Sequence, residues 1–113
     1  MDFQHTLRDT FVADHFHDLP GFVEARHGHN WEVEATVAGD AEPPIGFPEA
    51  LEAWVRTVDY TLLNDQPRLT GRNPTAEVLA QWLLEDLGAA GLAPLRIRIR
   101  EKAHYWAACE PAR

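Results

Sequence analysis

The stretch HGHNWEVEATV (residues 27–37) alternates between two kinds of side chain. One set is apolar apart from two histidines, and the set between is polar. The first set comprises His27, His29, Trp31, Val33, Ala35 and Val37. A period of two is typical of a β-strand that buries one face. This strand would carry two imidazoles on its buried side, where an unpaired polar group costs about 1–3 kcal/mol, so we expect a partner for both.

Three further segments predict strands. Residues 3–17 alternate imperfectly, which suits a long or bulged strand, and a turn at Pro20-Gly21 separates them from residues 27–37. Residues 95–100 alternate strictly, and after a short break residues 105–109 can form a last strand.

Two amphipathic helices lie between these strands in the sequence. From Pro48 the apolar positions follow helical spacing, and we expect this helix to end near Asn64. The segment NPTAE (residues 73–77) combines a cap residue, a proline and an acidic first turn, so a second helix begins here and ends before Gly88. The order is ββααββ. We expect one α+β domain over residues 1–113, with two helices on one face of a four-stranded antiparallel sheet.

Composition narrows the class of protein. The 113 residues include 10 Lys and Arg against 18 Asp and Glu, a net charge of −8, which argues against a nucleic-acid partner. No apolar run approaches the ~20 residues of a spanning helix, and the N-terminus lacks the order of a signal peptide, so we expect no membrane partner and a cytoplasmic location. Four Trp and five Phe in a chain this small favour a homo-oligomer.

The paired histidines suggest a metal site. His27 and His29 lie on the same side of one strand, roughly 6.5–7 Å apart along the backbone, so both rings can converge on one ion. His15, on the apolar side of the first strand, is the natural third ligand. Three imidazoles would leave Zn²⁺ an open fourth position, as in catalytic sites. By spacing alone, separate core or surface histidines explain the pattern equally well.

Four ordered segments of the chain carry a resemblance. They are FVADH (residues 11–15), HGHNW (27–31), NPTAEVLA (73–80) and IRIRE (97–101). In combination they resemble the motifs of the 6-pyruvoyl-tetrahydropterin synthase and 6-carboxy-tetrahydropterin synthase family, along nearly the whole chain.

That resemblance implies a fold, a cofactor and an assembly. The fold would be a tunnelling-fold (T-fold) subunit, with Zn²⁺ held through Nε2 of His15, His27 and His29. Family members pack their sheets into closed barrels of three subunits, often doubled to six, with active sites at subunit boundaries. A homo-oligomer of that kind, a trimer or a hexamer, is therefore expected.

The resemblance also implies substrate-binding residues. Family members bind a pterin through a glutamate that corresponds to Glu101, whose two oxygens can accept parallel N–H bonds from the aminopyrimidine edge. A surface glutamate beside Lys102 is the alternative. Thr75 and Glu77 match the family segment at the second helix start, where they could contact substrate or only cap the helix.

The chain departs from the family at its acid–base residues. The position of the family's proton-transferring cysteine, four before the first histidine of HGH, is Val23 here. The family's Asp-His pair corresponds to Asp59-Tyr60, so the aspartate remains and the histidine does not. Glu24 could supply a carboxylate base, and Tyr60 could move a proton beside Asp59; a solvated glutamate and a packing tyrosine are the alternatives. Cys109, by default a buried small hydrophobe, is a weaker substitute.

Three functions remain open. The first is a diverged zinc-dependent lyase or cyclase that activates a carbonyl or hydroxyl of a small heteroaromatic substrate, or condenses an aldehyde with an amine. The second is a pterin synthase acting on dihydroneopterin triphosphate. The third is a non-catalytic zinc-dependent protein that binds a metabolite. The lost cysteine favours the first over the second.

Overall fold

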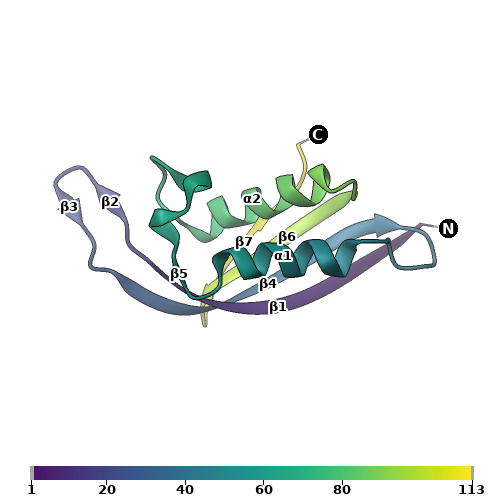
Figure 1. Ribbon diagram of the computed structural model, residues 1–113, viewed down its shortest axis with the longest axis horizontal. Helices are drawn as coiled ribbons and strands as arrows, with labels where there is room; N and C mark the ends of the chain where they lie inside the picture. Colours follow the sequence, from purple (N-terminus) through teal and green to yellow (C-terminus); the bar gives the residue numbers. More distant parts are fainter. Residues whose placement is uncertain (1, 113) are drawn as a thin grey trace.

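The computed structural model describes residues 2–112, and it is built on one pair of long strands. Strand β1 (Phe3–His15) pairs antiparallel with β4 (His27–Gly39) over the full length of both, so that His15 lies opposite His27. On the far side of β4 follow β6 (Pro94–Lys102) and β7 (Tyr105–Cys109), both antiparallel to their neighbours. These strands form a curved sheet (Figure 1).

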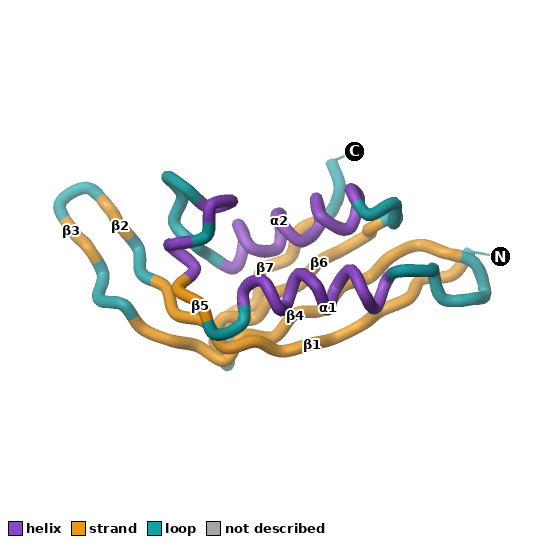
Figure 2. Tube along the Cα trace, in the orientation of Figure 1, coloured by secondary structure: helices purple, strands orange, loops and turns teal. Residues whose placement is uncertain are grey.

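Helices α1 (Phe47–Val58) and α2 (Ala76–Ala89) run side by side over one face of this sheet (Figure 2). The core lies between them and the alternating apolar side chains of the strands. Trp31 is fully buried there and stacks on Phe11, which in turn meets the edge of Trp54 from α1. The expected α+β architecture, with both helices on one face, is confirmed. Over the described residues, no helix has the length and apolarity needed to cross a membrane.

The sheet has five strands, whereas the sequence pattern predicted four. The additional strand is β5 (Thr61–Leu62), which pairs parallel with Ala13 and Asp14 of β1. It lies in a segment that was expected to be the end of the first helix, which finishes at Val58 rather than near Asn64.

Two bonds to β1 explain the early helix end. The carboxylate of Asp59 accepts a hydrogen bond from the Val12 amide at 2.8 Å, and the Tyr60 amide donates to the Val12 carbonyl at 2.6 Å. Tyr60 adopts a left-handed conformation with φ of 57°, which turns the chain out of the helix. Leu62 had matched the helical stripe only because an apolar residue also suits the short strand. Two 3-10 helices follow, η1 (Leu63–Asp65) and η2 (Pro67–Leu69).

The first strand is also shorter than expected, because β1 ends at His15 rather than His17. Beyond it, β2 (Asp18–Leu19) and β3 (Phe22–Val23) form a small hairpin around the predicted Pro20-Gly21 turn. This hairpin extends away from the body of the molecule (Figure 1).

Candidate metal and substrate site

Three histidines meet where β1 ends and β4 begins. The strand register places His15 opposite His27, and His29 follows two residues along the same face. One ring nitrogen from each of the three lies within 4.8 Å of the others. On the outer face of the sheet, a Cβ at Gly28 would stand 2.6 Å from Asp14 Oδ1, so any larger residue between the two histidines would displace the Asp14 carboxylate. The trio predicted from the sequence is therefore brought together.

Two of the three histidine rings, those of His15 and His27, each form a hydrogen bond to a backbone carbonyl oxygen. His15 Nδ1 lies 2.7 Å from the Pro74 carbonyl oxygen, and His27 Nδ1 lies 2.9 Å from that of Ala25. A carbonyl oxygen can only accept, so Nδ1 carries the proton and the lone pair is on Nε2. Such a contact is the usual way that a metal-binding histidine is oriented.

The Nε2 atoms of His15 and His29 are buried and have no hydrogen-bond partner among residues 2–112. Burial lowers the pKa of His29, and the neighbouring His15 and His27 lower it further although Glu101 opposes them, so the neutral ring is favoured. Two unpartnered buried nitrogens beside a third imidazole suit a divalent cation such as Zn²⁺, which binds neutral imidazole. The donor set therefore fits the expected metal.

Two carboxylates border the trio. Glu101 Oε1 lies 3.5 Å from His15 Nε2, with 16% of its side chain exposed. Glu24 Oε1 lies 3.8 Å from His27 Nδ1 and 3.6 Å from His17 Nδ1, and it accepts a hydrogen bond from the His17 amide at 3.1 Å. Partial desolvation raises the pKa of Glu24, but the His17 amide and the surrounding histidines lower it by more, so its net pKa is below the ordinary value. Two carboxylates thus stand beside a potential metal site.

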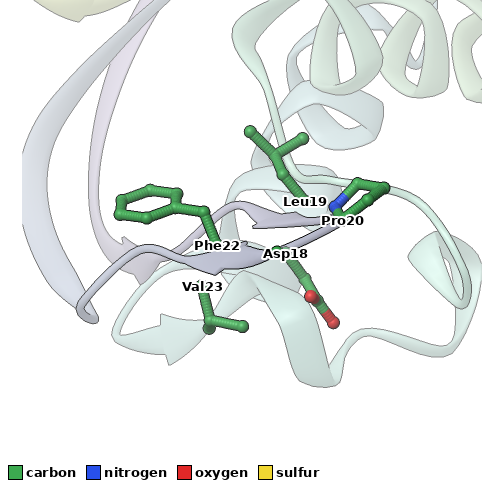
Figure 3. Close-up of a pocket in the computed structure, with 6 residues that line it drawn as sticks. Asp18, Leu19, Pro20, Phe22 and Val23 are labelled. Atoms are coloured by element: carbon green, nitrogen blue, oxygen red, sulfur yellow. The ribbon is translucent and has the colours of Figure 1, made fainter.

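Val23, at the position of the family's cysteine, lies away from this group. It is 63% exposed on the hairpin, paired with Asp18, while Leu19 pairs with Phe22. Figure 3 shows the Leu19 and Phe22 side chains on one face and those of Asp18 and Val23 on the other. Residues 18–23 line an open hollow of about 620 Å³, in which Asp18 is the one ionisable side chain.

The segment before α2 contacts the histidine trio through its backbone, since the Pro74 carbonyl oxygen lies 2.7 Å from His15 Nδ1. Thr75 is the N-cap, and its hydroxyl accepts a hydrogen bond from the Val78 amide at 3.2 Å, the capping role that the sequence had left open. Glu77 accepts a hydrogen bond from the hydroxyl of Tyr105, which lowers the pKa of Glu77 and raises the pKa of Tyr105. Tyr105 is not among the residues predicted from the sequence, because strand alternation gives no sign of a contact between β7 and α2.

Asp59 and Tyr60 occupy the sheet edge. The Asp59 carboxylate is engaged by the Val12 amide, and Tyr60 is 83% exposed beside Val12, Asp14 and Arg26. Val12 and Asp14 project from the face of β1 opposite to that of His15. Within one chain, these two residues are therefore not placed with the histidine trio.

We expect Asp59→Ala to destabilise the fold by about 1–3 kcal/mol, because the Val12 amide would lose its acceptor at the point where β5 joins the sheet. Thermal unfolding monitored by circular dichroism measures this loss. Glu49→Ala is the control, since this acidic residue lies in the first turn of α1 on the exposed side. An Asp59 variant as stable as the control would show that the bond contributes nothing to folding.

Comparisons with known proteins agree with this architecture. The sequence model of the family described as 6-pyruvoyl tetrahydropterin synthase matches residues 4–112. An Archaeoglobus fulgidus protein, provisionally named a 6-carboxy-5,6,7,8-tetrahydropterin synthase, is 28% identical over 99 residues, which are 80% of this chain and 83% of that protein.

Solved structures share the fold at low sequence identity. The Caenorhabditis elegans 6-pyruvoyl tetrahydropterin synthase superposes with a TM-score of 0.80 at 17% identity, covering 99% of this chain and 97% of that one. A Plasmodium vivax 6-pyruvoyltetrahydropterin synthase gives 0.75 at 12% identity, covering 98% of each chain; it is described as a catalytic-residue mutant in which alanine replaces a glutamate. The T-fold expected from the sequence is confirmed, and the chain belongs to the 6-pyruvoyl tetrahydropterin synthase family.

Proposed function

We propose that the protein is a zinc-dependent enzyme that acts on a reduced pterin bearing a three-carbon side chain, with dihydroneopterin triphosphate as the first substrate to test. The observation that carries this proposal is the position of Glu24. Its carboxylate lies between His17 and His27, at the border of the histidine trio. The family's cysteine is absent, but this carboxylate could accept a proton in its place.

The position of Glu24 makes a pterin synthase a stronger candidate than it was from the sequence. A diverged carbonyl lyase or cyclase was favoured because the family's cysteine is missing, and Glu24 would supply a base in its place. The Plasmodium vivax relative supports the same assignment, because its description names a glutamate as a catalytic residue. Family membership makes a pterin the natural substrate class. We therefore place the pterin reaction first.

Each residue has a role in this proposal. His15, His27 and His29 would hold the zinc ion, which supplies Lewis acidity toward an oxygen of the substrate side chain. Glu24 would remove or return a proton at the adjacent carbon. Glu101 would accept two N–H bonds from the aminopyrimidine edge of the pterin and so orient the ring.

The remaining candidates take lesser roles. Thr75 and Glu77 would line the substrate side of the site from the start of α2, with Tyr105 holding the Glu77 carboxylate. We retain Asp59 and Tyr60 as catalytic candidates only for the site of a neighbouring copy, since neither lies with the trio of its own chain.

We also propose that copies of this chain associate through their sheet edges. Strand β5 covers the outer edge of β1 only at Ala13 and Asp14, so within residues 2–112 the rest of that long edge is unpaired. Such an edge is a template for strand pairing with another chain. A closed barrel of three subunits, single or doubled, would satisfy these edges.

The test of function is mass spectrometry of the zinc-loaded protein incubated with dihydroneopterin triphosphate, with His27→Ala protein treated identically as the blank. We expect a new reduced pterin whose mass corresponds to loss of the triphosphate or of part of the side chain, and no such product in the blank. Unchanged substrate in the presence of bound zinc would refute the pterin-enzyme assignment.

A further inference from the structure

The segment that joins β1 to the hairpin is held by two asparagine side chains. The Asn64 carboxamide accepts a hydrogen bond from the Phe16 amide at 3.0 Å and donates to the Phe16 carbonyl at 2.9 Å. The Asn73 carboxamide does the same at Asp18, at 2.7 Å and 3.3 Å. Each carboxamide thus pairs with both backbone groups of one residue, as a neighbouring strand would.

His17, between these two residues, turns its backbone groups the other way and pairs with Glu24. Its amide donates to Glu24 Oε1 at 3.1 Å, and its carbonyl accepts a hydrogen bond from the Glu24 amide at 2.9 Å. Alternate residues of an extended segment bond to opposite sides. One side of residues 16–18 is therefore held by the two asparagines, and the other side holds Glu24.

Little else fixes Glu24. The hairpin that precedes it extends from the body of the molecule (Figure 1), and Leu19, Phe22 and Val23 are 47%, 60% and 63% exposed. Core packing therefore does not determine where the carboxylate stands. Asn64 belongs to η1, and Asn73 directly precedes Pro74, whose carbonyl orients His15. The same two segments thus connect the Glu24 position to the body of the fold and to the metal site.

We infer that Asn64 and Asn73 are positioning residues that act through His17 to hold the Glu24 carboxylate beside the histidine trio. We call the hydrogen bonds of Asn64 to Phe16 and of Asn73 to Asp18 the clamp. The clamp is a structural feature in its own right, but its effect on catalysis rests on the proposed role of Glu24. Because a misplacement of about 1 Å can cost up to about a hundredfold in rate, loosening the clamp lowers turnover without removing a reacting group.

The first arm of the test needs no substrate. Amide hydrogen exchange, followed by NMR in the zinc-loaded protein, is compared for wild type, Asn64→Ala and Asn73→Ala. We expect exchange at His17 and Glu24 to accelerate at least about tenfold in both variants, with core amides such as Val33 unchanged. Asn64→Asp keeps the acceptor for the Phe16 amide and should give an intermediate effect. Unchanged exchange at Glu24 would overturn the clamp.

The matched control is Gln66→Ala. Gln66 is also a carboxamide of this region, but it donates to the Thr57 carbonyl and the Thr61 hydroxyl rather than to residues 16–18. We expect its removal to leave exchange at His17 and Glu24 as in wild type. Equal acceleration in this control would mean that loosening the loop in general, and not the clamp, controls Glu24.

The second arm is a kinetic double-mutant cycle. Asn73→Ala should lower kcat about tenfold with KM little changed and zinc content intact, and it should cost nothing further in the Glu24→Gln background. Additive losses would overturn the inference that the asparagines act through Glu24. If the wild-type chain turns over no pterin, the proposed function fails by itself, and the exchange experiment alone decides whether the clamp exists.

Discussion

Replacing His29 by alanine is expected to reduce zinc affinity by more than about a hundredfold, because loss of a ligand should exceed the 10–100-fold cost of losing an outer partner. The His29 Nε2 atom is buried and has no hydrogen-bond partner among the described residues, and the centroid of its ring lies 5.0 Å from that of His15. Two remaining imidazoles cannot form the three-ligand set of a catalytic zinc site. Competition titration with a chromophoric chelator measures the affinity.

His5→Ala is the matched control for this experiment. His5 also lies on β1, but at the opposite end from His15, where its ring contacts the Asp40 carbonyl oxygen at 2.7 Å. We expect this variant to bind about one zinc per chain with wild-type affinity. An His29→Ala protein that retains zinc within about threefold of wild type would contradict the assignment of the trio.

The second large effect is expected for Glu24→Gln, which should lower kcat about 10²- to 10⁴-fold, the usual contribution of a general acid or base. Glutamine has nearly the same volume, and its carbonyl oxygen can still accept the hydrogen bond from the His17 amide. The substitution therefore removes the proton acceptor while preserving the local structure. Zinc content and KM should change little, because neither depends on that proton transfer.

Steady-state kinetics on zinc-loaded protein provide the measurement, with Glu42→Gln as the control. Glu42 is an exposed glutamate in the loop between β4 and α1, so the same change in charge occurs away from the site. A Glu24→Gln enzyme within about threefold of wild-type kcat would show that another group transfers the proton.

Much of the fold could be predicted because its periodic segments are long. The strict alternation of residues 27–37 is confirmed by β4, and the cap, proline and acidic turn of residues 73–77 place α2 at Ala76. The predicted end of the first helix was wrong, since the helix is stopped by two hydrogen bonds to Val12, which is 47 residues away from Asp59 in the sequence. No local pattern carries that information.

In the candidate site, the histidines were easier to predict from the sequence than the carboxylates. The HGH spacing places two rings on one face of a strand, and the strand pairing that brings His15 opposite His27 follows from adjacency of the two long strands. The carboxylates were harder to predict. Glu24 lies next to Val23 in sequence, and only the course of the hairpin shows which of the two side chains borders the trio.

Local patterns were sufficient to predict the class of fold and the three histidines, because strand and helix periodicity and ligand spacing are properties of short segments, and four ordered motifs were sufficient to indicate the family. Glu24 and Glu101 were candidates from the sequence, but only the three-dimensional structure shows that both border those histidines. It likewise shows that Asp59 bonds to β1 and that two asparagines hold residues 16–18. These contacts join segments brought together by packing of the helices and the hairpin against the sheet, and their hydrogen bonds are directional interactions that no sequence period encodes.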